Sequence, residues 1–348
     1  MERLSIQGDF FDCQLYGGRL YLWTFDGSLQ VYNYSKIIDE WLNKKEWQGM
    51  RGRQCHQYEG EASGIYINSI ELQRYLIYER GYLTDEFPTS TEVFSGGLYE
   101  ANAKGLFTCK LPVFKEMLPV EKILDSPLVY VGGEKYRGLV CAAGSDGMFW
   151  MPSVTEKREF VHLSPRQTIK ASFCNPGIYA QSSEGGAYLL LKDNARNYGK
   201  PFINENDLYP DMARRVYGQR MTWSWNNYFY LAEDHSLKVF EYASSKEAMK
   251  LKDEIHFFYW KGSFVSAGSS RCGTVVELDN AICLFEDWNK EDGHCTIIGP
   301  VTRWRMYPRS VSFSSHVHII FNDRMDIVIM NDSIKNWSEE RMARRYRR

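Results

Sequence analysis

Pairs of apolar runs recur along the chain, and a short polar turn separates the two runs of each pair. The clearest two examples are TFDGSLQVYNY at residues 24–34 and AEDHSLKVFEY at residues 232–242. Runs rich in β-branched and aromatic residues on both sides of a tight turn are typical of antiparallel hairpins. Asp, Asn and Gly suit such turns because they tolerate the backbone conformations that tight hairpins need. The pattern therefore predicts a chain of repeated β-hairpins.

Seven such hairpins can be traced, and their spacing is regular after the first. Their turns begin at Asp26, Ala103, Asp146, Glu184, Asp234, Asp279 and Asp323, with intervals of 77, 43, 38, 50, 45 and 44 residues. A period in the forties with a hairpin in each repeat is typical of β-propellers, in which each blade is a four-stranded antiparallel sheet. The residues before the first turn and after the last make up one further repeat length. We therefore predict an all-β, seven-bladed β-propeller, closed by pairing of the N-terminal strand RLSIQG with the C-terminal blade.

The first interval is long enough for one blade with an insertion or for two short blades. The segment SKIIDEWLNKKEW has apolar residues at helical spacing and Ser35 as a candidate N-cap. A helix here favours a helical insertion around residues 35–60, and seven blades; eight blades are the alternative. Such an insertion would offer a second docking surface through Trp41 and Trp47.

The hairpins resemble the WD40-like repeats of β-propellers. In that family an aromatic–polar pair, typically Trp-Asp, ends the third strand of a repeat; here the pairs are Tyr32-Asn33, Phe240-Glu241 and Phe285-Glu286. The Gly-His dipeptide that opens a WD40 repeat is absent. The resemblance implies one propeller over residues 1–337, followed by a basic tail over residues 338–348. It also implies that the turns between second and third strands share a face with the loops that link successive blades.

Two sets of residues on that face are candidates for binding. The first is an acidic set of turn residues: Asp26, Asp146, Glu184, Asp234, Asp279 and Asp323. These residues either serve turn geometry alone or attract a basic peptide. The second set lies in two inter-blade segments and comprises Arg214, Arg215, Arg220, Trp223, Arg303, Trp304, Arg305 and Arg309. Arg beside Trp suits anionic or flat ligands, although the tryptophans would serve equally well to fill the space between blades.

Composition changes this picture little. The net charge of −2 gives no overall field that would attract nucleic acid or an anionic membrane. The eight cysteines form no CxxC pair, and several lie in apolar runs, which favours a reducing compartment. Neither a secretory signal nor an apolar run long enough for a membrane span is apparent, so we expect a cytoplasmic protein.

No pattern of catalytic residues stands out. His316 and His318 would share one face of a strand, but no Cys or carboxylate at ligand spacing completes a metal site, and no phosphate-binding or dinucleotide-binding motif is present. We expect no cofactor and no metal. The sequence favours a non-catalytic scaffold or adaptor that binds a protein partner, as a subunit of a larger complex. The alternatives are a binder of nucleic acid or anionic ligands through the Arg/Trp segments, and a glycoside-type hydrolase centred on the channel.

Overall fold

The structure is a computed structural model. Of the 348 residues, it describes residues 2–42, 65–111, 119–134, 137–153, 159–174, 177–182, 186–192, 202–207, 220–226, 228–233, 236–243, 248–255, 262–270, 272–286, 294–308, 310 and 312–330. The chain divides into two compact units. Unit 1 comprises Met1–Phe11, Tyr34–Tyr75 and Val265–Arg348, and unit 2 comprises Asp12–Asn33 and Leu76–Phe264.

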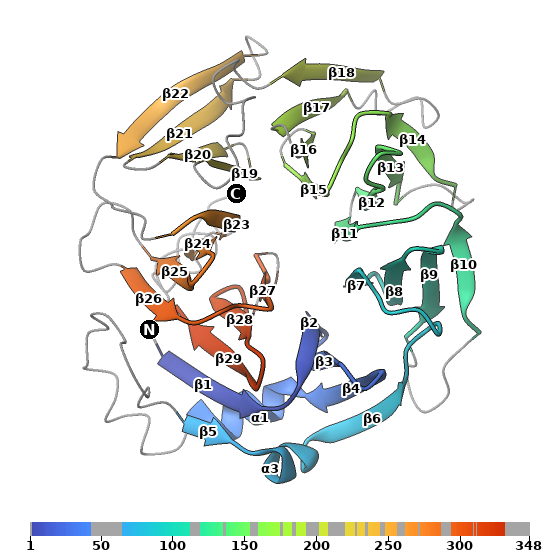
Figure 1. Cartoon of the computed structure of the whole chain (residues 1–348), viewed down its shortest axis with the longest axis vertical. Helices are drawn as coiled ribbons and strands as arrows, with labels where there is room; N and C mark the ends of the chain where they lie inside the picture. Colours follow the sequence, from blue (N-terminus) through green and yellow to red (C-terminus); the bar gives the residue numbers. More distant parts are fainter. Residues whose placement is uncertain are drawn as a thin grey trace, which may run out of the picture. The chain divides into compact units, whose positions relative to one another are not determined.

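The fold is that of a β-propeller. The described strands group into seven sheets (Figure 1). Each sheet contains four neighbouring strands in the order expected of a propeller blade. Each of the seven predicted hairpins forms the second and third strands of one sheet. The sequence prediction of an all-β propeller architecture is therefore confirmed.

Unit 2 contains five of these sheets, apart from Phe10 and Phe11 at the start of the first. The first contains β2 (Phe10–Tyr16), β3 (Arg19–Thr24), β4 (Ser28–Asn33) and β6 (Leu76–Gly81). The second contains β7 (Ser90–Phe94), β8 (Gly97–Asn102), β9 (Gly105–Lys110) and β10 (Glu121–Leu124). The third contains β11 (Tyr130–Glu134), β12 (Gly138–Ala142), β13 (Met148–Met151) and β14 (Val161–Ser164).

In the last two sheets of unit 2 the strands also lie side by side in the order of the sequence. One contains β15 (Lys170–Phe173), β16 (Ile178–Gln181), β17 (Gly186–Lys192) and β18 (Phe202–Asp207). The other contains β19 (Met221–Trp225), β20 (Tyr228–Glu233), β21 (Ser236–Ala243) and β22 (Ala248–Ile255). In both sheets a short hairpin joins the second strand to the third.

Unit 1 contains the remaining two sheets. One contains β23 (Phe264–Ser270), β24 (Gly273–Leu278), β25 (Ala281–Phe285) and β26 (His294–Ile298). The other has five strands in the order β27 (Arg303–Met306), β28 (His316–Ile320), β29 (Arg324–Ile329), β1 (Glu2–Gln7) and β5 (Ile65–Ile67). These two sheets share a core of buried aliphatic residues that includes Val275, Ile282, Ile319 and Val328.

Burial along the strands explains their hydrophobic patterns. The middle strands β12, β25 and β28 are buried at every position, because side chains on both faces of these sheets pack against other parts of the protein. Strand β6, the last of its sheet, alternates between half-buried and exposed positions. Buried runs therefore indicate strands in the middle of a sheet, and alternation of half-buried and exposed positions indicates a strand at its edge.

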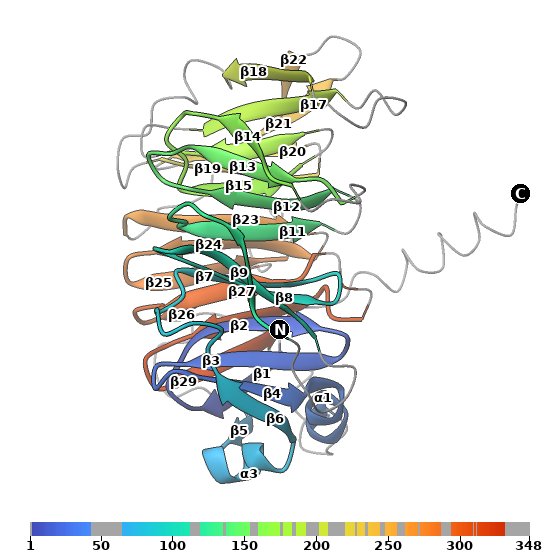
Figure 2. The same ribbon diagram turned by 90° about the vertical axis from the view of Figure 1, so that its right-hand side faces the viewer.

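The structure describes the two ends of the insertion in the first interval, and residues 43–64 lie outside the described residues. The described part contains helix α1 (Tyr34–Leu42), strand β5 and helix α3 (Ser69–Gln73), and no further four-stranded sheet lies among the residues described in this interval. The start at α1 is as predicted, but the insertion extends beyond residue 60, and β5 pairs in parallel with β1. Figure 2 shows α3 directly beyond β5. A parallel strand contributed by an insertion has no hairpin signal in the sequence, which is why it was missed.

Helix α1 does not offer Trp41 as a docking surface. Trp41 is buried together with Ile37 and Ile38, and its indole Nε1 donates to the Tyr75 hydroxyl at 3.2 Å. The expectation of a docking surface at Trp41 is therefore wrong, because the apolar face of this short helix packs into unit 1. Trp47 lies outside the described residues. None of the helices that the structure describes is long and apolar enough to cross a membrane.

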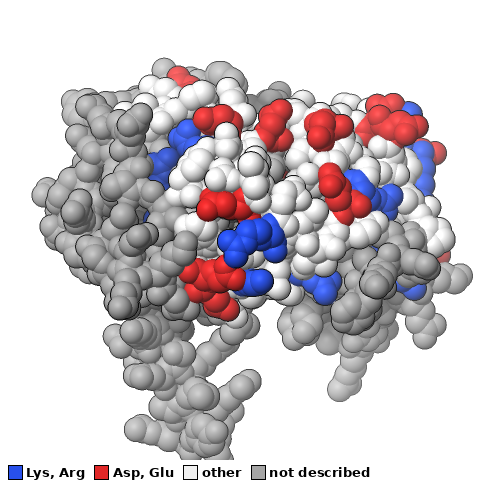
Figure 3. All heavy atoms as spheres, turned by 90° about the horizontal axis from the view of Figure 1, so that it is seen from below, with Lys and Arg blue, Asp and Glu red and all other residues white. Residues whose placement is uncertain are grey.

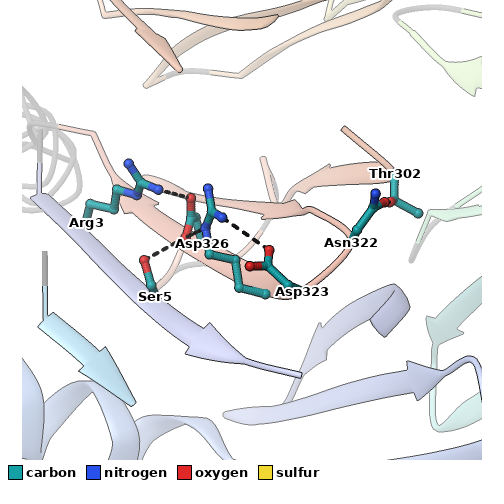
Figure 4. Close-up of polar contacts among 7 residues, drawn as sticks. Arg3, Ser5, Thr302, Asn322, Asp323 and Asp326 are labelled. Carbon is teal, nitrogen blue, oxygen red and sulfur yellow. Dashed lines mark hydrogen bonds and ion pairs between the residues drawn. The ribbon is translucent and has the colours of Figure 1, made fainter. Parts of the chain in front are cut away.

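The N-terminal strand pairs with the C-terminal part of the chain. Strand β1 runs antiparallel to β29 over six residue pairs, from Glu2 with Ile329 to Gln7 with Arg324. A buried polar cluster connects the two strands (Figure 4): Ser5 Oγ donates to Asp326 Oδ1 at 2.7 Å, and Arg3 Nη2 lies 2.5 Å from Asp326 Oδ2. This is the strand pairing that the sequence predicts. The basic tail at residues 338–348 lies outside the described residues.

Candidate functional site

The structure places five of the eight predicted Arg/Trp positions; Arg214, Arg215 and Arg309 lie outside the described residues. Arg220 and Trp223 belong to unit 2, at and near the start of β19. Trp223 is buried and stacks on Tyr230 of β20, with ring centroids 5.1 Å apart and an interplanar angle of 6°. Arg220 Nη2 forms an ion pair with Glu233 Oε1 at 3.1 Å. These contacts favour a packing role for Trp223.

The other three predicted residues, Arg303, Trp304 and Arg305, follow one another on β27 in unit 1. The Trp304 indole Nε1 donates to Ser266 Oγ at 2.7 Å and to Glu277 Oε2 at 2.9 Å, so this side chain joins β27 to the sheet of β23 and β24. The Arg303 guanidinium lies over the Phe11 ring, 5.7 Å from its centroid. Trp304 is therefore held by its neighbours, and the arginines remain the predicted anion-binding groups of this strand.

A cluster of histidine and tyrosine side chains lies inside unit 1. The Tyr34 hydroxyl, at the start of α1, is 2.6 Å from His316 Nδ1 and 2.8 Å from His318 Nε2. The Tyr307 hydroxyl lies 3.0 Å from His318 Nδ1. All four residues are buried, and burial lowers the pKa of His316 to about 4 and that of His318 well below its usual value. Both histidines are therefore neutral near pH 7.

Neutral histidines allow a continuous chain of hydrogen bonds through this cluster. If Tyr307 donates to His318, then His318 donates through Nε2 to Tyr34, and Tyr34 donates to His316. The reverse order is equally consistent, because each neutral imidazole offers one donor and one acceptor. The sequence prediction that the two histidines share one face of a strand is confirmed, since both contact the same hydroxyl. Their partner is a tyrosine from a distant segment, which sequence spacing does not reveal.

In the part of the chain that the structure describes, no three side chains of His, Cys, Asp or Glu lie together in a way that could hold a metal ion. Seven cysteines are described, and all are buried with free thiols: Cys13, Cys109, Cys141, Cys174, Cys272, Cys283 and Cys295. Burial raises the pKa of Cys109 to about 11 and that of Cys174 to about 12. Thiols in this state pack as small apolar groups and are poor nucleophiles.

Two exposed phenylalanines lie side by side in unit 2. Phe25 is in the turn between β3 and β4, and Phe87 is in the loop between β6 and β7; their exposed fractions are 46% and 48%. The two rings stack with centroids 5.9 Å apart and an interplanar angle of 21°. Tyr82 packs edge-on against Phe87 at 6.0 Å. We call this pair and its flanking residues Asp26 and Asp85 the Phe25/Phe87 surface.

Hydrogen bonds hold the turn that carries Phe25. The Asp26 carboxylate accepts from the Thr24 hydroxyl and from the Ser28 backbone N–H, and the first of these bonds is the main reason that its pKa is lowered. Gly27 has a φ of 92°, in the left-handed region that glycine enters without strain. The Tyr82 N–H donates to the Gly27 carbonyl at 3.1 Å, which ties the turn to the end of β6. Asp26 thus has the structural role expected of a turn residue.

A buried carboxylate anchors the loop that carries Phe87. Glu100 on β8 accepts from the Trp23 indole at 2.8 Å and from the Leu83 backbone N–H at 2.7 Å, and burial raises the pKa of its carboxyl. Thr89, at the other end of the loop, donates to the Leu128 carbonyl at 2.7 Å. Both phenylalanines are therefore presented on backbone that is fixed at several points, which lowers the entropy cost of binding a partner.

A comparison of the repeats in the sequence could have identified Phe25 as a candidate binding residue. At the position before the first turn residue, five of the six sister repeats have a polar residue, namely Asn102, Ser145, Ser183, Glu233 and Asn322, and the sixth has Leu278. An aromatic residue there is unexpected for a solvent-facing turn. Phe87 lies in a loop without such a repeat, so only the structure brings it to Phe25.

On the face drawn in Figure 3, acidic and basic side chains of the described residues are interspersed. This agrees with the net charge of −2 and gives no extended basic surface on that face.

Comparisons with known proteins report only the fold. No family model matches the chain, and no curated protein matches it. Ika8, a computationally designed protein of known structure, is 10% identical, with a TM-score of 0.50 over 94% of this chain and 99% of that chain. BBS1N, solved in complex with ARL6DN, is 10% identical, with a TM-score of 0.49 over 95% of this chain and 94% of that chain.

A further solved structure, a functionally unknown protein from Desulfotomaculum acetoxidans DSM 771, is 6% identical, with a TM-score of 0.47 over 91% of this chain and 90% of that chain. At these identities a likeness carries no functional residues from one protein to another. The architecture rests on the described sheets themselves: the chain is a β-propeller.

Proposed function

We propose that this protein is a non-catalytic scaffold or adaptor that docks a protein partner through the Phe25/Phe87 surface, as a subunit of a larger complex. The observation that carries the proposal is the exposure of two stacked phenylalanines on anchored backbone, whereas the described aromatic residues Trp23, Tyr34 and Trp223 are buried. Aromatic residues that are rigid and exposed are common among residues that dominate binding energy at protein interfaces.

Two further features belong to this proposal. The seven sheets are the blades of one closed ring, and the pairing of β1 with β29 supplies the closing contact, which would remove an exposed sheet edge. The protein works in a reducing, intracellular compartment, which the buried free thiols of the described cysteines support.

Replacing both phenylalanines by alanine is expected to weaken capture of the partner about ten-fold or more, because truncation of residues central to an interface typically has an effect of this size. The measurement is affinity purification of the intact chain from an extract of its source cells, followed by quantification of each co-purifying protein. Thermal melting of the variant verifies that the fold is retained.

The matched control is the double variant Val161→Ala, Leu251→Ala, since these residues are also exposed apolar side chains of unit 2. Equal loss of partner in the control, or no loss in the phenylalanine variant, would show that docking occurs elsewhere.

Reversing charge at Arg303 and Arg305 to Glu separates this proposal from the nucleic-acid or anionic-ligand alternative. Docking at the Phe25/Phe87 surface predicts undiminished partner capture by this variant. An anionic ligand held by these arginines predicts strong loss, together with a steep decrease of wild-type binding as salt is raised. Identification of the co-purifying material as protein or nucleic acid at low and high salt completes the measurement.

A further inference from the structure

The charges around the two phenylalanines favour one kind of partner. Asp26 directly follows Phe25, and its carboxylate is stabilised in the ionised form by hydrogen bonds from Thr24 and Ser28. Asp85 precedes Phe87 by two residues and is exposed. Each exposed ring therefore has a carboxylate within two residues of it along the chain.

Basic side chains nearby do not balance these carboxylates. Lys104 Nζ forms an ion pair with Glu86 at 2.7 Å, which is the main reason that the pKa of this lysine is raised, and Asp85 adds to the same effect. One lysine thus serves two carboxylates. Arg80, on the strand that leads into this loop, donates through Nε to the Gly81 carbonyl at 2.9 Å, and its charge also acts on the buried Glu100. Among these described side chains the carboxylates of Asp26, Asp85 and Glu86 outnumber the cations of Lys104 and Arg80, so the surface around the stacked rings has an excess of negative charge.

A planar cation fits this combination better than other side chains do. A guanidinium stacks on an aromatic face and forms forked hydrogen bonds with a carboxylate at the same time. An acidic partner would be repelled, and a wholly apolar partner would cover Asp26 without providing it with a counter-charge, which is unfavourable. The stacked rings supply the apolar contact area, and the flanking carboxylates supply the charge selectivity.

We propose that the Phe25/Phe87 surface binds an arginine-containing basic segment of the partner protein, with a guanidinium over the phenylalanine rings and paired with Asp26 or Asp85. This inference rests on the proposed docking function and specifies the chemistry of its partner. It gives the acidic turn residue of this one blade a recognition role in addition to its role in turn geometry.

A library of random short peptides displayed on phage and selected against the intact, folded chain tests this proposal. We expect the selected peptides to be enriched in Arg over Lys, and enriched in basic over acidic residues. A synthetic peptide of the selected sequence should bind the double variant Asp26→Asn, Asp85→Asn about ten-fold more weakly than wild type, because both carboxylates that can pair with the guanidinium are neutralised. It should bind Phe25→Leu, Phe87→Leu several-fold more weakly, because leucine keeps apolar area but lacks the aromatic face.

The control is Asp125→Asn, which neutralises an exposed carboxylate on a different loop of unit 2, between β10 and β11, and should leave the peptide affinity unchanged. Selection of acidic or uncharged peptides, selection of no peptides, or equal binding of a basic peptide to wild type and both double variants would overturn the inference. If the phenylalanine-to-alanine variant still loses its cellular partner in any of these cases, the docking function stands and only the partner chemistry is wrong. If neither peptide nor partner depends on the phenylalanines, both proposals fail.

Discussion

Deleting residues 2–9 is expected to lower the free energy of unfolding by roughly 5 kcal/mol or more, a large part of the ~5–15 kcal/mol that stabilises a typical protein. The deletion removes β1, whose Leu4 and Ile6 are fully buried, and burial of one such side chain contributes about 1.5–3 kcal/mol. It also removes Ser5 and Arg3 from the buried Asp326, which retains Arg324 Nε at 3.3 Å, and weaker compensation of this buried charge adds to the loss. Strand β29 is left with an unpaired edge.

The comparison is deletion of residues 341–348, which shortens the chain by the same number of residues at its other end. Thermal and urea unfolding, followed by circular dichroism, measures the stability of both truncated chains. A second variant, Leu4→Asp with Ile6→Asp, retains the chain length and is also expected to be strongly destabilised. Equal stability of the two truncated chains would contradict the proposal that β1 closes a ring of blades.

Acidification from pH 7 to pH 5 is expected to destabilise the wild-type protein by about 2 kcal/mol more than the variant His316→Asn. In the folded protein burial lowers the pKa of His316 from 6.5 to about 4, so the unfolded chain binds a proton at a higher pH than the folded protein does. The stability from this histidine is present above pH 6.5 and decreases as the pH falls towards 4, by about 1.4 kcal/mol for each pH unit. His318 shifts in the same direction and adds to the decrease.

Asparagine is the conservative replacement because its side-chain amide can occupy the place of Nδ1, the atom that lies beside the Tyr34 hydroxyl. The measurement is urea unfolding at a series of pH values for wild type and variant. His162→Asn, which replaces an exposed histidine, serves as the control and should retain the acid sensitivity of the wild type. Identical pH profiles for wild type and His316→Asn would show that His316 does not contribute to the acid sensitivity.

The hairpin signals in the sequence were reliable because they are local. A tight turn needs particular residues at fixed positions, such as Asp26 and Gly27, and the flanking strands need apolar residues to bury. The same reasoning located the pairing of β1 with β29, since a repeat that lacks its last strand has an edge that the other end of the chain can complete. It failed for β5, whose parallel pairing with β1 depends on where an insertion returns to the sheet.

The candidate sites were predicted less well, because composition does not show which way a side chain points. The Arg/Trp segments suggested an exposed surface, yet Trp223 stacks inside its own sheet and Trp304 donates to two residues of another strand pair. Conversely, Phe25 and Phe87 are separated by about sixty residues in the sequence, and their stacking results from two loops that end side by side.

The sequence by itself determined the all-β propeller architecture, the hairpin in each of the seven sheets and the pairing of the first strand with the last, because these features follow from turn chemistry and hydrophobic periodicity. Only the tertiary structure decided that Tyr34 lies between His316 and His318, that Trp41 is buried, and that Phe25 and Phe87 are exposed together. These features depend on contacts between residues that are distant in the sequence, and no local pattern of polar and apolar positions encodes such contacts.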